Sequence, residues 1–226
     1  MTEMTDDVAP DVALQDNTSQ RLPCVLVLDA SGSMAGTPIK QLNAGVQLLE
    51  SELKKDDMAS QRVQILVIRF GDTVSALGEW ADAMDFAAPT LVAGGATPMG
   101  AAVRLALQKL EEQKARYNAH GIQYNRPWMF LITDGEPTDH DWQHAAAECR
   151  AAEEGKHLTC YAIGVGDDAD MAKLAQFSTG PTAKLDGLEF QKLFKWLSNS
   201  ISAASKAQKG STVQYDAPSH WMAGQT

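Results

Sequence analysis

Residues 24–36 read CVLVLDASGSMAG, and this stretch decides the fold. Its first five residues are all apolar, which suits a short strand that is buried on both faces of a sheet. The small and polar residues that follow, up to Gly36, predict a loop that leaves the strand and leads into a helix. The stretch therefore indicates a strand-loop-helix unit of the kind that builds α/β domains.

The rest of the chain repeats this unit. Apolar side chains recur every three or four positions from Ile39 to Leu53 and from Phe190 to Ile201, which predicts two one-faced helices. Further short apolar runs, which predict strands, lie at residues 63–68, 128–132 and 158–163. Shorter helices are expected at residues 98–117, 139–154 and around 171–177, and an edge strand at 73–80.

Strands and helices that alternate in this way predict a doubly wound, Rossmann-like α/β fold. We expect a mostly parallel six-stranded sheet with helices on both faces and one antiparallel edge strand. In such sheets, ligands bind beyond the carboxyl ends of the strands, near the point where the strand order reverses. The loops that follow the strands are therefore the expected location of a functional site.

Composition indicates a globular protein without a nucleic-acid or membrane partner. Apolar residues make up 44% of the 226 residues, enough for a sizeable core. The net charge is -10, and there is no long basic cluster to hold a phosphate backbone. No apolar run approaches the roughly 20 residues that span a bilayer. We therefore expect a cytoplasmic protein whose cysteines, Cys24, Cys149 and Cys160, are reduced and buried.

Charge and composition divide the chain into three parts. Residues 1–20 contain acidic but no basic side chains and predict a disordered acidic tail. One folded domain is expected over residues 21–205. Residues 206–226 are rich in Gly, Ser and Ala and lack a sustained period, so they predict an appendage whose order the sequence does not define.

Three oxygen-bearing side chains follow the first strand at alternate positions. Asp29, Ser31 and Ser33 converge if the chain leaves the sheet extended, because alternate side chains of an extended segment point the same way. Small hard cations bind to such clusters of oxygen atoms. The alternative is that the two serines cap the following helix and that Asp29 closes a turn.

Two further loops each bring an oxygen ligand to the same edge. Thr97 lies in GGATPMG at residues 94–100, and Asp134 lies in TDGEPTD at residues 133–139, where an apolar run ends. Thr97 with Pro98 is also typical of a helix cap, and Asp134 of an ordinary turn. One shared site explains all three loops, whereas caps and turns require three coincidences.

In this combination of motifs, the sequence resembles the von Willebrand factor A domain family. The metal-ion-dependent adhesion site of that family combines an Asp-x-Ser-x-Ser loop with a distant Thr and a distant Asp. The resemblance implies that Ser31, Ser33 and Thr97 are direct metal ligands. It also implies that Asp29 and Asp134 bind the metal directly or through water.

The resemblance covers about residues 22–204. The stretches LDASGSMAGTPIKQLN, GGATPMGAA, PWMFLITDGEPTD and FKWLSNSIS are most similar to the cytoplasmic bacterial TerY-like proteins that are associated with tellurium resistance. Such proteins belong to stress-response systems that often include a protein kinase and a metal-dependent Ser/Thr phosphatase. The resemblance therefore implies an adaptor in a signalling complex, with these two enzymes as partners.

The ligand set predicts recognition rather than catalysis. Two carboxylates balance the charge of a divalent cation and three hydroxyls add none, so the metal retains affinity for another anionic oxygen. An Asp or Glu of a partner protein would supply it. Mg²⁺ is the expected ion, with Mn²⁺ or Ca²⁺ as alternatives, because Mg²⁺ prefers six oxygens and usually keeps waters. The alternative function is a metal-independent scaffold that binds through its helices.

An enzyme is not expected. Haloacid-dehalogenase-type phosphatases place a nucleophilic Asp at the end of the first strand, where Asp29 lies, but need a second Asp where this chain has Ser31. The chain also has neither a phosphate-binding Gly-x-x-x-x-Gly-Lys-Ser/Thr loop nor a Gly-x-Ser-x-Gly elbow. Metal-dependent phosphoester hydrolysis is the least favoured alternative.

A second motif with two interpretations is HDWQH. It places His140 and His144 one helical turn apart, as in zinc peptidases, but Asp141 replaces the Glu that such a site needs. The favoured interpretation is a helix with Thr138 or Asp139 as its N-cap.

Three further hypotheses concern single features. Glu136 or His140 would line the rim where a partner docks. Trp196 is expected to pack in the core rather than to contact a partner. The acidic tail, through Asp6, Asp7, Asp11 and Asp16, would compete for the metal of its own chain, against the favoured alternative that it is solvated.

Overall fold

The computed structural model describes residues 19–166, 169–180, 182–185, 189–207 and 222–224. Most of the acidic tail, residues 1–18, lies outside the described residues. So does most of the C-terminal appendage, of which residues 222–224 are described as a strand.

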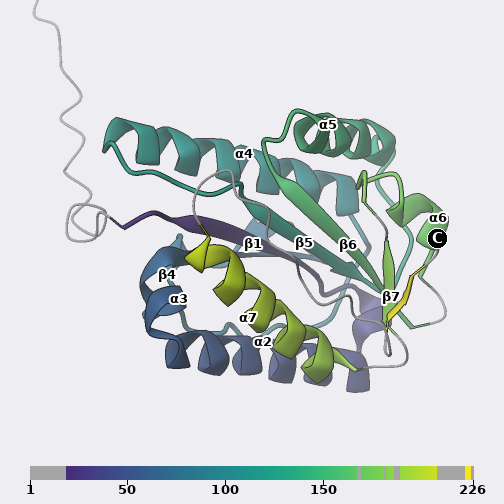
Figure 1. Cartoon of the computed structure of the whole chain (residues 1–226). Coiled ribbons are helices and arrows are strands. Elements are labelled where there is room, and N and C mark those ends of the chain that lie inside the picture. The colour runs from purple at the N-terminus through teal and green to yellow at the C-terminus, as the bar shows by residue number, and fades with distance from the viewer. Residues whose placement is uncertain (1–18, 167–168, 181, 186–188, 208–221, 225–226) are drawn as a thin grey trace, which may run out of the picture.

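One eight-stranded sheet forms the centre of the molecule (Figure 1). Its order is β3-β2-β1-β5-β6-β7-β8, and β4 pairs with β2 beside β3. Neighbours from β2 to β7 are parallel, and β3, β4 and β8 are antiparallel to their partners. The strands are β1 Leu22–Asp29, β2 Val63–Phe70, β3 Ser75–Ala76, β4 Ala81–Asp82, β5 Trp128–Thr133, β6 Thr159–Val165, β7 Ala183–Leu185 and β8 Met222–Gly224.

The predicted fold class is confirmed, but the sheet has more strands than expected. The single edge strand predicted at 73–80 is two short antiparallel pieces, β3 and β4, because Gly78 turns the chain between them with φ 88°. At the other edge, β8 adds a further antiparallel strand. The prediction of six strands with one antiparallel edge was therefore wrong in number.

Helices cover both faces of the sheet, as predicted (Figure 1). One face carries α2 Thr37–Lys55, α3 Asp57–Arg62 and α7 Phe190–Lys206, and the other carries α4 Met99–Ala119, α5 Trp142–Glu154 and α6 Met171–Leu174. The helix α3 was not predicted, because six residues are too few to show a period. Its N-cap identifies it instead: the Asp56 carboxylate accepts hydrogen bonds from the backbone N–H groups of Met58 and Ala59 at 3.1 and 3.0 Å.

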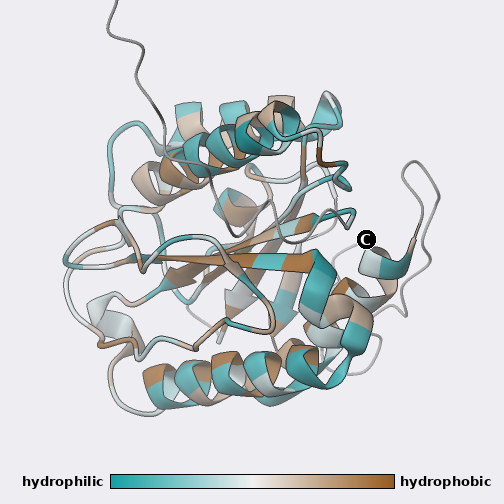
Figure 2. Cartoon of the chain, turned by 90° about the vertical axis from the view of Figure 1, so that its left-hand side faces the viewer, coloured by the Kyte–Doolittle hydropathy of each residue, from teal (hydrophilic) through white to brown (hydrophobic). Residues whose placement is uncertain are grey.

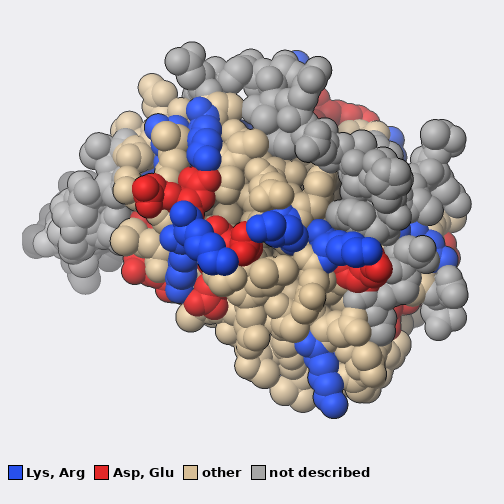
Figure 3. Space-filling view, turned by 60° about the horizontal axis from the view of Figure 1, so that its bottom comes forward, with Lys and Arg blue, Asp and Glu red and all other residues tan. Residues whose placement is uncertain are grey.

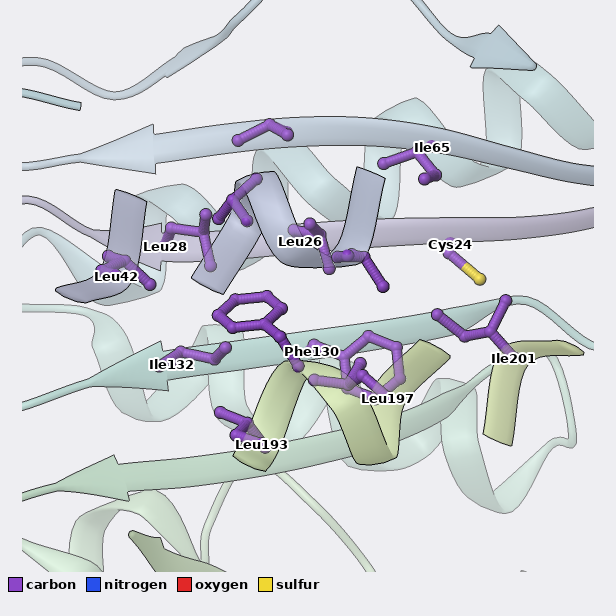
Figure 4. Close-up of a cluster of buried hydrophobic side chains, with 14 of the residues drawn as sticks. Cys24, Leu26, Leu28, Leu42, Ile65, Phe130, Ile132, Leu193, Leu197 and Ile201 are labelled. Atoms are coloured by element: carbon purple, nitrogen blue, oxygen red, sulfur yellow. The ribbon is translucent and has the colours of Figure 1, made fainter. Parts of the chain in front are cut away.

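The first strand supplies side chains to both cores. All eight residues of β1 are buried, as its unbroken apolar run predicts. Leu26 and Leu28 face α2 and α7, where Figure 4 shows them beside Phe130, while Val25 and Val27 face α4 and α5. Figure 2 shows hydrophobic residues concentrated along the central strands.

The helices α2 and α7 approach each other closely. A Cβ atom at Gly45 would lie 2.4 Å from the Phe194 ring, so only glycine permits this contact. Lys and Arg alternate with Asp and Glu on the outer surface of this layer (Figure 3). Ion pairs there include Lys195 with Glu52, which joins α7 to α2. Trp196 packs partly buried against the core with its ring edge-on to Tyr161, as expected.

All three cysteines are free and buried, as predicted. Within the described residues, none of the helices combines the length and the apolar character that a bilayer span requires.

Candidate functional site

The candidate site lies at the carboxyl ends of β1 and β5. These strands are neighbours at the point where the sheet order reverses, since β1 pairs with β2 on one side and with β5 on the other. Asp29 is the last residue of β1, and Asp134 follows directly after β5. Fold topology therefore brings together two carboxylates that are 105 positions apart in the sequence.

Asp29 forms the floor of the site. Its side chain is fully buried, and its two carboxylate oxygens accept hydrogen bonds from the Ser31 backbone N–H at 2.7 Å and from the Thr133 hydroxyl. Burial raises the pKa of Asp29 from 3.8 to about 6, against the effect of these hydrogen bonds, and the nearby negative charge of Asp134 raises it further. Both of these bonded partners of the carboxylate are uncharged.

The two serines and Asp134 form a chain of oxygen atoms above this floor. Ser31 Oγ and Ser33 Oγ lie 3.0 Å apart, and the Ser33 hydroxyl donates a hydrogen bond to Asp134 Oδ1 at 2.7 Å. Ser31 is buried and Ser33 is exposed, so the site opens from the buried floor toward solvent.

Thr97 reaches the same place from the loop before α4. That loop is fastened to the first one by a hydrogen bond from the Gly32 N–H to the Gly95 carbonyl at 3.0 Å. Gly95 has φ 81°, and a Cβ atom there would lie 2.4 Å from the Asp72 backbone, so this close approach requires glycine. A Cβ atom at Gly135 would lie 3.5 Å from Thr97 Oγ1, which places Thr97 against the loop that carries Asp134.

The structure therefore brings all five predicted residues to one edge of the sheet, and it decides against the helix-cap alternative. Ser31 precedes a short 3₁₀ helix, Gly32–Met34, without a side-chain capping bond. The N-cap of α2 is Gly36, and the N-cap of α4 is Pro98 rather than Thr97. The three hydroxyls are thus available for another role, although Asp29 does close a turn on Ser31 as the alternative proposed.

Three residues that support the site were not predicted as parts of it. Thr133 binds Asp29 and also accepts a hydrogen bond from the Gly135 N–H at 3.1 Å. Thr138 Oγ1 accepts from the Thr97 N–H at 3.0 Å. The Asp139 carboxylate accepts from two N–H groups at the start of α4, those of Gly100 at 3.2 Å and Ala101 at 2.8 Å.

This arrangement corrects the prediction for the next helix. Thr138 and Asp139 were expected to cap a helix that starts at 139, but they serve the loop and helix α4 instead, and α5 starts at Trp142. The buried residues of α5 are Trp142, Ala145, Ala146 and Cys149.

The HDWQH motif does not form the helical pair of a zinc peptidase. His140 precedes α5, and Asp141 forms an ion pair with Arg104 of α4. Across the described residues, no group of three or more His, Cys, Asp or Glu side chains is placed to hold a metal ion. Near the candidate site, Glu136 is exposed and forms an ion pair with Lys173 of α6.

The donor set suits a small hard cation. It consists of oxygen atoms alone, from two carboxylates and three hydroxyls, which is the chemistry of Mg²⁺, Mn²⁺ and Ca²⁺ sites rather than of sites for soft metals.

A similar sequence is the uncharacterized protein sll0103 of Synechocystis sp., which is 28% identical over 206 residues. The match covers 83% of this chain but 44% of the relative, so the chain spans less than half the length of that protein.

Solved structures show the same fold at low identity. The pilus adhesin SpaC of Lactobacillus rhamnosus GG has a TM-score of 0.65 and 15% identity, over 83% of this chain and 32% of SpaC. Proximal thread matrix protein 1 of the mussel byssus, in a structure described as having a zinc-occupied MIDAS motif, has a TM-score of 0.57 and 16% identity, over 82% of this chain and 49% of that one.

The family model of the von Willebrand factor type A domain matches residues 24–195, which include every strand from β2 to β7 and all five candidate ligands. The chain therefore belongs to the von Willebrand factor type A domain family.

Proposed function

We propose that this chain is a metal-dependent protein interaction module that binds a carboxylate of a partner through a divalent cation. Members of its family are generally interaction modules rather than enzymes. In this chain, the ligands would be Asp29, Ser31, Ser33, Thr97 and Asp134. Mg²⁺ is the proposed ion, with Mn²⁺ and Ca²⁺ as alternatives.

The observation that carries the proposal is that three hydroxyls, none of which caps a helix, lie close to two carboxylates. A helix-capping or turn role would leave these side chains bonded to the backbone, but Ser31, Ser33 and Asp134 are bonded to one another at 2.7 and 3.0 Å. Because two carboxylates only balance a divalent charge, the bound ion would attract one more anionic oxygen. The exposed position of Ser33 leaves that coordination position open to an Asp or Glu of a partner.

The proposed setting is a cytoplasmic stress-response system of the tellurium-resistance type. The support for this setting is the similarity to TerY-like proteins in the motif stretches quoted above, together with three free thiols that suit a reducing compartment. In that setting the chain would act as an adaptor, and a protein kinase and a metal-dependent Ser/Thr phosphatase would be its partners.

Metal binding is tested first on the isolated protein. After chelator treatment, addition of Mg²⁺ or Mn²⁺ should raise the melting temperature as the metal concentration exceeds its dissociation constant. Ser33→Ala should abolish this response. Ser51→Ala is the matched control, since its hydroxyl bonds the Leu48 carbonyl on α2, away from the site. A wild-type protein that responds to neither ion would contradict the proposal.

Partner binding is tested by capture from cell extract in Mg²⁺ and in chelator. Capture that needs Mg²⁺ and is lost in Ser33→Ala supports the proposed module. Equal capture in chelator supports the metal-independent scaffold instead. Turnover of phosphoesters that needs the metal and Asp29 would restore the hydrolase alternative.

A further inference from the structure

A pocket of about 500 Å³ lies at the opposite end of the sheet from the candidate metal site. Pro127 precedes β5 and His157 lies just before β6, so this pocket is at the amino ends of the strands. Its lining includes Lys114 from α4, Arg126 beside Pro127, and Lys156 beside His157. The pocket belongs to no part of the proposed function.

The charge of this pocket is opposite to that of the whole chain. Three of its lining residues are Lys or Arg and one, Glu111, is acidic, whereas the chain carries a net charge of -10. Glu111 is bonded to Lys114 at 2.5 Å. Arg126 and Lys156 are exposed and have no ion-pair partner among the described residues. Two uncompensated positive charges therefore face the pocket.

Lys156 also occupies a backbone position that favours glycine. Its φ is 59°, and it is the one non-glycine residue with positive φ in the described part of the chain. It ends the turn after α5, where the His157 N–H donates to the Ala152 carbonyl at 2.8 Å. A glycine at position 156 would adopt this conformation at a lower conformational cost than a lysine does.

Gln20 and Arg21, which are among the first described residues, lie at the rim of the same pocket. The Arg21 N–H donates to the Gln123 carbonyl at 2.8 Å, and the Asn125 N–H donates to the Arg21 carbonyl at 2.8 Å. Gln20 also bonds the side chain of Asn125. Both Tyr124 and Asn125 line the pocket, so whatever precedes residue 19 starts beside it.

The segment that precedes residue 19 is acidic and has no basic side chain. Its nearest acidic residue, Asp16, is three positions before Ser19, within roughly 10 Å of it in an extended chain. The metal site lies at the far end of β1, roughly 26 Å away for eight residues of strand. A short link gives the acidic segment a high effective concentration at the near pocket.

We propose that the pocket around Arg126 and Lys156 is a docking site for the acidic segment of the same chain, whose acidic residues are Glu3, Asp6, Asp7, Asp11 and Asp16. Carboxylates of the segment pair there with the side chains of Arg126 and Lys156. The acidic segment would then bind at the end of the sheet opposite the metal site, and it would not compete for the metal. It is independent of the proposed function, since neither cation contributes to the metal site.

Zero-length coupling of carboxylates to lysine amines in the full chain tests this proposal. Peptide mapping should find the segment of residues 3–16 joined to Lys156 at least five-fold more often than to Lys40, an exposed lysine of α2. Salt at about 0.5 M should remove the preference by screening. Arg126→Glu keeps the Lys156 amine but reverses a neighbouring charge, and should lower the yield several-fold. Lys40→Glu is the matched control and should leave the yield of coupling to Lys156 unchanged.

Three outcomes would overturn the proposal. The first is coupling to Lys156 no more frequent than to Lys40. The second is coupling between isotope-labelled and unlabelled copies in a mixture, which would show an interaction between chains. The third is protection of Lys156 from acetylation by inorganic phosphate without any coupling to the acidic segment, which would assign the pocket to a small anion.

Discussion

The Thr133 hydroxyl donates a hydrogen bond to the buried carboxylate of Asp29 and so joins the last residue of β5 to the last residue of β1. The same Thr133 oxygen accepts the Gly135 N–H at 3.1 Å. One side chain therefore holds the floor of the candidate site and the turn that presents Asp134. This makes Thr133 a positioning residue for two of the five candidate ligands.

Thr133→Val should weaken metal binding while the fold persists. Valine has nearly the shape of threonine, but it cannot hold the Asp29 carboxylate or the Gly135 turn. Loss of such a supporting hydrogen bond typically costs 10–100-fold in metal affinity, and we expect about 10-fold here. Titration calorimetry with Mg²⁺ or Mn²⁺ measures the change. Thr133→Ser retains the hydroxyl and should bind nearly as the wild type does; equal loss in both variants would refute the positioning role.

Asp29 should make the stability of the metal-free protein depend on pH. Its pKa is about 6 in the folded state against 3.8 ordinarily, so the folded state binds its proton more tightly than the unfolded state does. The Asp29 contribution to the free energy of unfolding is therefore fully present below about pH 4 and disappears as the pH rises through about 6. A shift of this size corresponds to at most about 3 kcal/mol.

Asp29→Asn removes this titration without changing the size of the side chain. Urea denaturation in chelator should show the wild type gaining stability relative to Asp29→Asn as the pH falls from 7 to 4. Addition of Mg²⁺ at pH 7 should stabilise the wild type and leave the variant unchanged. Stability curves that run parallel across this pH range would contradict the assignment of a raised pKa to Asp29.

Asp139→Ala should destabilise the start of α4 and, through it, the position of Thr97. The substitution removes the acceptor for the N–H groups of Gly100 and Ala101. Loss of a capping side chain costs about 1 kcal/mol, which chemical denaturation can measure, and we expect a few-fold weaker metal binding as well. Asp141→Ala is the control, because this exposed carboxylate pairs with Arg104 and makes no capping bond to α5. If both variants lose metal affinity equally, the effect is not specific to Thr97.

The core elements were predictable because their signal is local. Unbroken apolar runs and spacings of three and four residues predicted β1, β2, β5, β6, α2 and α7, and burial confirms them. Two short elements were not predicted, because the three residues of β7 and the six residues of α3 are too few to show a period. The strand β7 forms because it pairs with β6, and α3 begins where the Asp56 side chain caps it.

The candidate ligands were predictable, but their supports were not. Asp29, Ser31 and Ser33 lie in one loop, so their alternation is visible in the sequence. Asp139 was interpreted as the cap of the helix that follows it, since capping rules consider only nearby positions. In the structure its partners Gly100 and Ala101 are 39 and 38 positions away.

The sequence by itself determined the fold class, the buried strands and which five oxygen-bearing residues share an edge of the sheet. It did so because apolar runs and spacings identify the strands and helices, and parallel strands end at the same edge of a sheet. Only the tertiary structure decided how Thr133, Thr138 and Asp139 hold that edge. It also decided which basic residues line the pocket at the opposite edge of the sheet, where β1 begins. These contacts join segments far apart in the sequence, and hydrogen bonds or charges between such segments depend on distances that only the packed fold sets.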